Sequence, residues 1–321
     1  SVVENPNVMA FGFPSVNTYA MFGGNDVATM FGSDGDDRFT GRETYGLMKG
    51  DGGAFVNFAK GFDTLTADVE ETDGTDVAIL YDSPGDDRLE AGEFEASFDY
   101  DASSPVSDPD LIAKCFDQTY TYATSGGNDV STMTGSTGYE RFTVKETFSN
   151  IKGNSGAYFH YATGFDEYFA DVTVGGEGGF DKAYIYDAAT DDAVEISPTQ
   201  ATIDFDATPG SPDVDATATG FDEVYAYAEN GGTDAAIMHG STGLDKFYGL
   251  LGYSYYRADD YSYYNYAKGF DTVQANAVGA GDYAYMYGSN GNDILTADPN
   301  SAAFELNPIS GSGVVNSVAA F

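Results

Sequence analysis

The stretch GGNDVATMFGSDGDDRFTG, residues 23–41, joins a short run of alternating apolar residues to two turns rich in glycine and aspartate. Glycine and aspartate turns of this kind also occur in parallel β-rolls that are built on a nine-residue repeat. Here the two key acidic residues, Asp26 and Asp37, are eleven positions apart. A nine-residue coil cannot keep that spacing, so the sequence predicts a different coil with a longer strand between its turns.

The same pattern recurs six times along the 321-residue chain, always with its two acidic residues eleven positions apart. The six pairs are Asp26 and Asp37, Asp76 and Asp87, Asp129 and Glu140, Asp181 and Asp192, Asp234 and Asp245, and Asp282 and Asp293. A second motif, Gly-Phe-Asp or a close variant, starts at positions 12, 61, 115, 164, 220 and 269, in steps of 49, 54, 49, 56 and 49 residues. Short and long units alternate. We therefore expect a single repeat domain, 1–321, made of paired repeats over residues 12–114, 115–219 and 220–321.

Apolar residues in each unit recur with a period of two, which is typical of β-strands. Two and four residues after the first acid of a unit lie pairs such as Ala78 with Leu80 and Ala236 with Met238, which we expect to point inward. The residue two positions after the second acid should also point inward. In the six units these residues are Phe39, Leu89, Phe142, Val194, Phe247 and Leu295.

Short strands separated by repeated turns predict an all-β fold, a parallel β-helix (β-solenoid) of six alternating short and long units. A coil with three short faces needs about two dozen residues, so each unit is expected to contain two coils. A six-bladed β-propeller is the alternative, because its repeats have a similar length. The alternation of unit lengths and the absence of Trp favour the solenoid.

The charge of the chain limits its partners, because 52 acidic residues face only 13 Lys and Arg and give a formal net charge of −39. Such a surface repels nucleic acid and anionic bilayers and attracts cations. No run of eighteen apolar residues is present, so we expect no membrane insertion. The single cysteine, Cys115, excludes an intramolecular disulfide framework.

The acidic turns are the candidate cation sites. If coils stack about 5 Å apart, equivalent carboxylates repel by about 3 kcal/mol per neighbouring pair at an effective dielectric constant of about 20. Calcium, which prefers oxygen ligands, would offset this repulsion; alternatively, each aspartate accepts N–H bonds from its turn and solvent screens the rest. The candidate ligands are Asp26, Asp36, Asp37, Asp76, Asp86, Asp87, Asp234, Asp245, Asp282 and Asp293. Glu140 and the turn DAATDD, residues 187–192, depart from the pattern and indicate that not every turn binds an ion.

The aspartates of the Gly-Phe-Asp motifs have a different expected role. Pro14 takes the place of aspartate in the first motif, and proline cannot bind a metal ion. We therefore expect these aspartates to shape the chain where strands begin. They are Asp63, Asp117, Asp166, Asp222 and Asp271.

The stretch YSYYRADDYSYYNYAKGF, residues 253–270, is the densest concentration of tyrosine in the chain. Rigid amphipathic rings on a strand surface can contact polysaccharide or another subunit, and they can also form a cross-strand ladder that needs no partner. The candidate contact residues are Tyr255, Tyr256, Tyr261, Tyr263 and Tyr264.

No catalytic residue is predicted. The two histidines, His160 and His239, occupy positions at which the other units have different residues. A β-helix polysaccharide lyase or hydrolase would use Tyr, Lys or paired carboxylates. Such enzymes interrupt their repeat around a cleft, whereas this repeat is regular throughout.

The two ends of the chain are alike, because SVVENPNVMAF (1–11) resembles SGVVNSVAAF (312–321). Solenoids usually carry caps that protect their terminal coils, and neither end has a recognisable cap. We expect another copy to continue the stack axially, either within a longer polypeptide or by head-to-tail docking.

The segments GFDEVYAYAENGGTDAAIM (220–238) and DVAILYDSPGDDRL (76–89) resemble the giant secreted acidic repeat proteins of planctomycete-type bacteria. This resemblance extends over nearly the whole chain and implies an extracellular or cell-surface structural role with bound calcium. The leading hypothesis is therefore an extracellular structural protein of a fibre, sheath or surface layer, stacked end to end and stiffened by calcium. A surface module that binds polysaccharide through its tyrosine-rich face is the second hypothesis, and a carbohydrate-active enzyme is the third.

Overall fold

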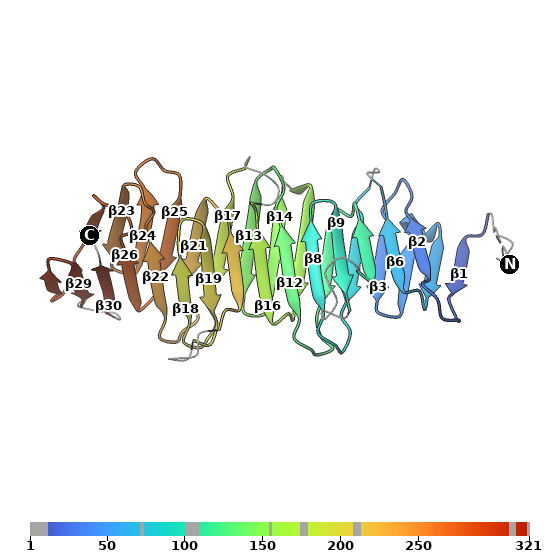
Figure 1. Cartoon of the computed structure of the whole chain (residues 1–321), viewed down its shortest axis with the longest axis horizontal. Helices are drawn as coiled ribbons and strands as arrows, with labels where there is room; N and C mark the ends of the chain where they lie inside the picture. The colour runs from blue at the N-terminus through green and yellow to red at the C-terminus, as the bar shows by residue number, and fades with distance from the viewer. Residues whose placement is uncertain are drawn as a thin grey trace.

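The computed structural model describes residues 12–70, 74–100, 109–153, 156–173, 179–207, 213–307 and 313–319. In this part the chain forms two sheets of fifteen strands each, which face each other along one long axis (Figure 1). The described residues contain a short 3-10 turn, η1 (Asp51–Gly53), and no α-helix. The predicted all-β solenoid is confirmed. The propeller is excluded, because its blades would be separate sheets. The similar terminal stretches 1–11 and 312–321 lie wholly or partly outside the described residues.

We name the two sheets A and B and give their strands in spatial order. Sheet A contains β1 (Ser15–Tyr19), β5 (Val56–Lys60), β4 (Tyr45–Lys49), β3 (Arg38–Arg42), β7 (Val77–Tyr81), β11 (Gln118–Tyr122), β15 (Tyr158–Thr163), β14 (Phe148–Gly153), β13 (Glu140–Lys145), β17 (Lys182–Tyr186), β21 (Glu223–Tyr227), β25 (Tyr264–Lys268), β24 (Tyr253–Ala258), β23 (Asp245–Leu250) and β27 (Tyr283–Met286). Sheet B contains β2 (Val27–Phe31), β6 (Thr64–Asp68), β10 (Leu111–Lys114), β9 (Glu95–Asp99), β8 (Arg88–Gly92), β12 (Val130–Thr134), β16 (Glu167–Asp171), β20 (Ala216–Thr219), β19 (Gln200–Asp204), β18 (Ala193–Ile196), β22 (Ala235–His239), β26 (Thr272–Asn276), β30 (Val314–Ala319), β29 (Ser301–Leu306) and β28 (Ile294–Asp298).

Each unit contains one three-stranded antiparallel meander, and the meanders alternate between the two sheets. In the first unit β3, β4 and β5 are antiparallel neighbours in sheet A, and in the second unit β8, β9 and β10 form the same arrangement in sheet B. The strands between meanders cross from one sheet to the other and pair in parallel, as β7 does with β11. This alternation accounts for the paired repeat that the sequence predicts.

The meander also explains why the long and short units differ in length. The connection between the second and third strands of a meander runs from Asp99 to Leu111 in sheet B but only from Lys49 to Val56 in sheet A. The expectation of three faces per coil and two coils per unit is wrong. The coil has two faces, and the meander fills the remaining length of the unit.

The inward positions predicted from the period of two are mostly confirmed. Ala78, Leu80, Ala236 and Met238 are buried in the core between the sheets. Among the residues that follow the second acid, those buried are Phe39, Leu89, Phe142, Val194 and Phe247. Leu295 is instead 61% exposed, so its predicted burial is wrong.

The two sheets are staggered by one strand, which explains the exposure of Leu295. Strands of sheet A face strands one place earlier in sheet B, as β3 faces β10 and β4 faces β6. Consequently β1, the first strand of sheet A, and β28, the last strand of sheet B, have no facing strand among the described residues. Leu295 lies on β28.

Candidate functional site

The acidic residues of three successive units are linked by hydrogen bonds across neighbouring strands. The backbone N–H of Asp87 donates to the carboxylate of Asp129 at 2.9 Å, and the N–H of Asp129 donates to Asp166 at 2.7 Å. We call such a set a carboxylate triad: the second acid of one unit, the first acid of the next, and the aspartate of the following Gly-Phe-Asp motif. The complete triads are Asp37–Asp76–Asp117, Asp87–Asp129–Asp166, Glu140–Asp181–Asp222 and Asp192–Asp234–Asp271. Each Gly-Phe-Asp aspartate in a triad thus accepts a backbone N–H where a strand begins, which matches its expected structural role.

The second acid of a unit also accepts hydrogen bonds from its own turn. Asp87 accepts the backbone N–H of Ser83 at 2.7 Å and the Ser83 hydroxyl at 2.9 Å. The same two donors serve Asp37, Asp245 and Asp293 in their turns. Such turn hydrogen bonds are the alternative to calcium that the sequence analysis gives for stabilising these carboxylates.

The predicted calcium ligands differ in burial. Asp37, Asp76, Asp87, Asp234 and Asp245 are buried, Asp26, Asp282 and Asp293 are half-buried, and Asp36 and Asp86 are exposed. The exposed Asp36 and Asp86 each accept a backbone N–H from the turn of the neighbouring strand, of Thr75 and of Asn128 respectively.

Three groups of carboxylates in the described part of the chain have oxygens within 4.8 Å of one another. They are Asp82–Asp87–Asp129, Asp187–Asp192–Asp234 and Asp204–Asp206–Asp215. Only two predicted ligands, Asp87 and Asp234, belong to them. The sequence does carry a signal for the first two groups, because Asp82 and Asp187 stand where the other four units have glycine, as in Phe31-Gly32-Ser33.

Burial shifts the ionisation of these acids. It raises the pKa of Asp87 and of Asp192 to about 7 and that of Asp129 to about 6, although backbone hydrogen bonds act in the opposite direction. Neighbouring carboxylates add to the rise, since two charges 4.8 Å apart repel by about 3 kcal/mol at an effective dielectric constant of about 20. Such groups can hold protons or bind a hard cation near neutral pH.

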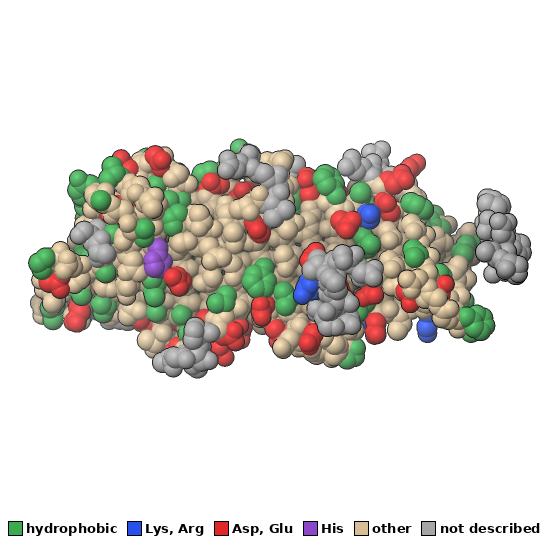
Figure 2. All heavy atoms as spheres, in the orientation of Figure 1, with side chains coloured by type: hydrophobic (Ala, Val, Ile, Leu, Met, Phe, Trp, Pro, Cys, Tyr) green, Lys and Arg blue, Asp and Glu red, His purple; other side chains and the backbone are tan. Residues whose placement is uncertain are grey.

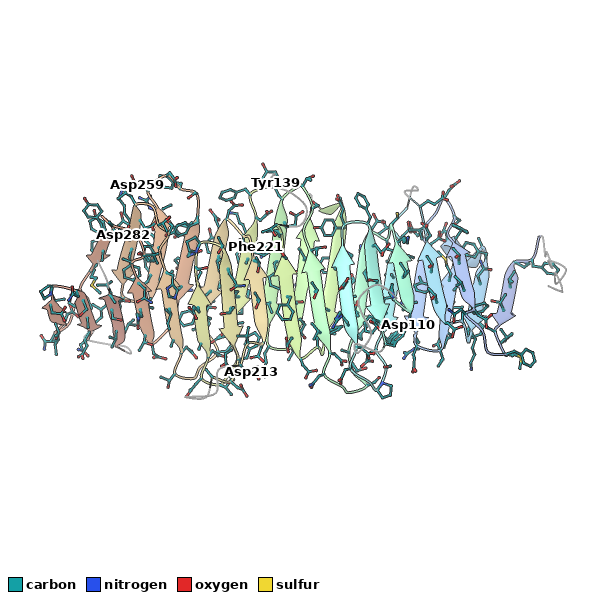
Figure 3. All side chains as sticks on the ribbon, in the orientation of Figure 1. Asp110, Tyr139, Asp213, Phe221, Asp259 and Asp282 are labelled. Carbon is teal, nitrogen blue, oxygen red and sulfur yellow. The ribbon has the colours of Figure 1, made fainter. Side chains whose placement is uncertain are left out.

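Acidic side chains are exposed along the length of the face shown in Figure 2. Asp and Glu side chains gather toward both long edges of the visible face (Figure 2). Asp259 and Tyr139 lie on one of these edges, Asp213 lies on the opposite edge, and the Phe221 side chain lies between them (Figure 3). Acidic residues of the connecting loops thus lie along the edges of the rod, whereas Phe221, the phenylalanine of a Gly-Phe-Asp motif, lies within it.

Tyrosines on six adjacent strands of sheet A form a continuous row of ring contacts, in which four of the five pairs are stacked and the pair Tyr225–Tyr264 is tilted by 48°. We call this set the tyrosine ladder: Tyr184, Tyr225, Tyr264, Tyr255, Tyr248 and Tyr285, on β17, β21, β25, β24, β23 and β27. Successive ring centroids are 5.2, 5.9, 5.6, 4.5 and 4.9 Å apart. Each ring therefore directs much of its face at a neighbouring ring.

The predicted contact tyrosines separate into three environments. Tyr255 and Tyr264 belong to the tyrosine ladder. Tyr256 and Tyr263 are buried, at 0% and 4% exposure, so the prediction that they contact a partner is wrong. Tyr256 points inward because it alternates with Tyr255 on β24. Tyr261 is 69% exposed, with the Arg257 guanidinium 4.3 Å from its ring centre.

The two histidines lie in different environments. His160 is buried, its Nε2 lies 2.8 Å from the carbonyl oxygen of Gly92, and burial lowers its pKa to about 4. It is therefore neutral at physiological pH. The His239 side chain lies against the Glu195 carboxylate, with Nε2 2.9 Å from Oε1.

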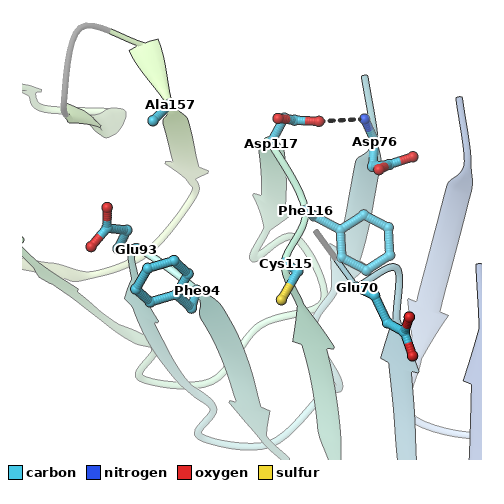
Figure 4. A pocket seen from close by; sticks show the side chains of 8 residues that line it. All are labelled: Glu70, Asp76, Glu93, Phe94, Cys115, Phe116, Asp117 and Ala157. Carbon is cyan, nitrogen blue, oxygen red and sulfur yellow. Dashed lines mark hydrogen bonds between the residues drawn. The ribbon is translucent and has the colours of Figure 1, made fainter. Parts of the chain in front are cut away.

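A hollow of about 250 Å³ surrounds the one cysteine (Figure 4). It is lined by Glu70, Asp76, Glu93, Phe94, Cys115, Phe116, Asp117 and Ala157. None of these eight residues is His, Lys or Arg, which are the side chains that activate a thiol. Asp117 is engaged with the backbone N–H of Asp76 at 2.7 Å, as part of its triad.

The two ends of the rod expose strand edges and apolar side chains. We call β1 with β2 the N-terminal edge and β27 with β28 the C-terminal edge. In addition to Leu295, the exposed apolar residues at these ends include Phe13, Val27, Phe31, Tyr283 and Ile294. Among the described residues three triads are also incomplete: Asp26 with Asp63 has no first member, Asp245 with Asp282 has no third member, and Asp293 is a first member without the other two.

No protein-family model matches the chain, and no curated protein or solved structure matches it. The described residues contain no helix with the length and apolar character needed to cross a membrane.

Proposed function

We propose that this chain is a structural protein, a rigid acidic rod that joins end to end with further copies and so forms or belongs to a fibre, sheath or surface layer. An extracellular or cell-surface location is part of this proposal and rests on the resemblance of the repeat to secreted acidic repeat proteins. The complementarity of the two terminal edges carries the proposal.

The internal pairings give the register for a junction between copies. β1 is the sequence equivalent of β11 and β21, and β27 is the equivalent of β7 and β17. Within the chain β7 pairs with β11, and β17 pairs with β21 in the same register. Applied to the ends, this register places β1 of one copy beside β27 of the previous copy, with Tyr19 opposite Tyr287. The internal equivalents of that pair, Tyr186 and Tyr227, stack at 5.2 Å.

The second pair of strands follows the same rule in sheet B. β8 pairs with β12 and β18 pairs with β22, so β28 would pair with β2 of the next copy. Leu295 would then lie beside Ala28, as Val194 lies beside Ala236. The one-strand stagger makes the ends fit, because β1 of the next copy would also face β28 and cover Leu295.

The incomplete triads support the same junction. Asp26 already donates its backbone N–H to Asp63 at 2.7 Å. These two residues correspond to the second and third members of a triad. Asp293 is the missing first member, and the proposed register brings its N–H to Asp26 of the next copy. The triad begun by Asp245 and Asp282 would meet Pro14, which offers no carboxylate.

Energetics favour closing these edges. Unpaired strand edges readily pair with other chains, and covering an exposed leucine contributes about 1.5 to 3 kcal/mol when burial is complete. The contact joins two different surfaces, so it repeats without closing and gives an open fibre. Calcium would stiffen this fibre by offsetting the repulsion among its carboxylates, because a chain with a net charge of −39 attracts cations.

The tyrosine ladder supports a structural role more than glycan binding. Aromatic side chains bind sugars through the face of the ring, whereas the closest ladder pairs stack on each other, with Tyr248 and Tyr255 only 4.5 Å apart and 14° from parallel. Cross-strand aromatic pairs of this kind stabilise a sheet without any partner.

One pair of substitutions on β28 tests the proposal. Leu295→Glu places a charge on the face that the junction buries, whereas Thr296→Glu places it on the outer face, where Glu90 and Glu195 occupy the equivalent positions of β8 and β18. Both residues are exposed in the single chain, so both variants should fold as the parent does. In sedimentation and negative-stain microscopy, Leu295→Glu should remain monomeric while Thr296→Glu assembles. Equal assembly by both variants would refute the junction.

A further inference from the structure

The turn at residues 187–192, which the sequence pattern does not favour as an ion site, departs from the usual Gly-Ser-x-Gly turn at Asp187, Ala188 and Thr190. The first two changes lie next to each other and alter the oxygens and donors around Asp192. Asp187 replaces the usual glycine and adds a carboxylate, and Ala188 replaces the usual serine and removes a hydroxyl donor. The first change brings Asp187 to within 4.8 Å of Asp192 and Asp234. The second leaves Asp192 with the backbone N–H of Ala188 on Oδ2, at 3.0 Å, and no hydrogen-bond partner on Oδ1.

Asp192 is only 1% exposed, so its unpartnered oxygen has no ready access to bulk water. A buried polar atom without a partner is rare and costly in a native protein. The chain therefore leaves a buried carboxylate oxygen unsatisfied within a group of three carboxylates. A cation bound to this oxygen would explain the arrangement.

The equivalent turn in the second unit provides the contrast. Asp82, Asp87 and Asp129 are equally close together, but Ser83 is present there. Its hydroxyl donates to Asp87 Oδ1 at 2.9 Å, the atom that corresponds to the unpartnered Oδ1 of Asp192. Both oxygens of Asp87 thus have protein donors, and this group is satisfied without a ligand.

The spacing suits one hard divalent cation. Three oxygens at most 4.8 Å apart lie no more than 4.8/√3, or about 2.8 Å, from a common centre, and calcium binds oxygen at about 2.3 to 2.6 Å. A small contraction reaches calcium distances. Magnesium requires about 2.0 to 2.1 Å in strict octahedral geometry, which demands a larger movement of strands that are already paired.

We propose that Asp187, Asp192 and Asp234 bind one divalent cation, preferentially calcium, and that the loss of the serine hydroxyl at position 188 is what opens this turn to the ion. Four other oxygens of the site already accept protein donors: Asp192 Oδ2, both oxygens of Asp187, and Asp234 Oδ1. Asp187 accepts the backbone N–H and the side-chain amide of Asn230 at 2.6 and 2.8 Å, and Asp234 accepts the N–H of Asp192 at 3.0 Å. These contacts hold two carboxylates in place around the free oxygen of the third.

This site gives a specific location for the calcium of the proposed function, on which it rests in that respect. Calcium binding at the site does not depend on assembly of the rods. The site lies entirely within one chain and away from both terminal edges. A chain that assembles without binding calcium would refute the site alone, and a monomeric chain that binds calcium would refute the junction alone.

Isothermal titration calorimetry with calcium chloride on the chelator-stripped chain tests the site. The parent chain should bind one calcium ion at this site, and Asp192→Asn should abolish that binding. Asp87→Asn, which removes the equivalent charge from the satisfied turn, should retain it. Ala188→Ser should weaken binding at least tenfold, because the introduced hydroxyl would donate to Asp192 Oδ1 as Ser83 does to Asp87.

Circular dichroism of each variant shows whether it is folded. Ala188→Ser keeps the test decisive if Asp192→Asn fails to fold, since serine occupies the equivalent position in the other five turns. The absence of calcium binding by the parent chain would overturn the proposal. So would equal losses from Asp87→Asn and Asp192→Asn, or binding that Ala188→Ser leaves unchanged.

Discussion

The buried carboxylates should make the protein less stable as the pH rises, which is the reverse of the usual behaviour of aspartate. Burial raises the pKa of Asp87 from 3.8 to about 7 in the folded chain, whereas the unfolded chain keeps the ordinary value. Between these values the folded state binds a proton that the unfolded state does not. The stability contributed by this proton is therefore fully present below about pH 4 and is lost as the pH rises through about 7.

The size of the effect follows from the shift in pKa. A difference of about 3 units corresponds to about 4 kcal/mol, of which about 3 kcal/mol is lost between pH 5 and pH 8. That loss is large beside a typical folding free energy of about 5 to 15 kcal/mol. Asp87→Asn removes the titrating group, so the variant should lose about 3 kcal/mol less than the parent over this interval.

Denaturant unfolding at pH 5 and pH 8 in the presence of a chelator measures this difference, and hydrogen exchange of β8 and β12 locates it along the rod. Asp86→Asn is the control, because it removes a charge from an exposed position of the same turn. A parent chain at least as stable at pH 8 as at pH 5 would contradict the reasoning. So would an Asp87→Asn variant with the pH dependence of the parent.

Two further comparisons test the packing of the rod. A Cβ at Gly127, where φ is +132°, would lie 1.9 Å from the carbonyl oxygen of Gly85 on the neighbouring turn, whereas a Cβ at Gly126, with φ +86°, would meet nothing within 4 Å. Gly127→Ala should therefore cost at least about 3 kcal/mol in denaturant unfolding and Gly126→Ala about 1 kcal/mol; equal costs would show that the close approach between turns is unimportant. Tyr256→Ala should cost about 3 to 5 kcal/mol because it empties a fully buried site, while Tyr261→Ala should change stability by less than about 0.5 kcal/mol. The reverse order in thermal melts would show that the Tyr256 side chain is not part of the core.

The sequence predicts the local structure of this protein well, because local structure follows from periodicity. The alternation of Ala78 with Leu80 and of Ala236 with Met238 identifies the inward face of each strand. The eleven-residue spacing of the acids excludes a nine-residue roll. The alternation of unit lengths also indicates the paired repeat before its cause is known.

The meander could not be predicted, because its returning strands carry no motif of their own. β4 and β9 do not follow a paired-acid turn or a Gly-Phe-Asp motif, so the sequence predicts a second coil in the part of the unit that they occupy. Which tyrosines are buried and which are exposed could not be predicted from the sequence for a related reason. In a run such as Tyr255-Tyr256 the composition is the same on both faces, and only the register of β24 decides which ring is buried.

The carboxylate groups depend on contacts between distant segments. Asp187 and Asp234 are 47 positions apart in the sequence, and their proximity follows from the pairing of β17 with β21 and of β18 with β22, which places the two intervening turns side by side. The replacement of glycine by Asp187 was visible in the sequence. Its meaning required the strand register that brings Asp234 beside it.

The axial repeat of assembled material tests the end-to-end junction most directly. Fifteen strands per sheet, spaced about 4.8 Å apart, advance each copy by about 72 Å along the rod. If the junction continues the internal register, cryo-electron microscopy should show filaments with this axial repeat and with both sheets unbroken across each boundary. Separate rods at high protein concentration, or copies joined by contacts along their sides, would contradict it.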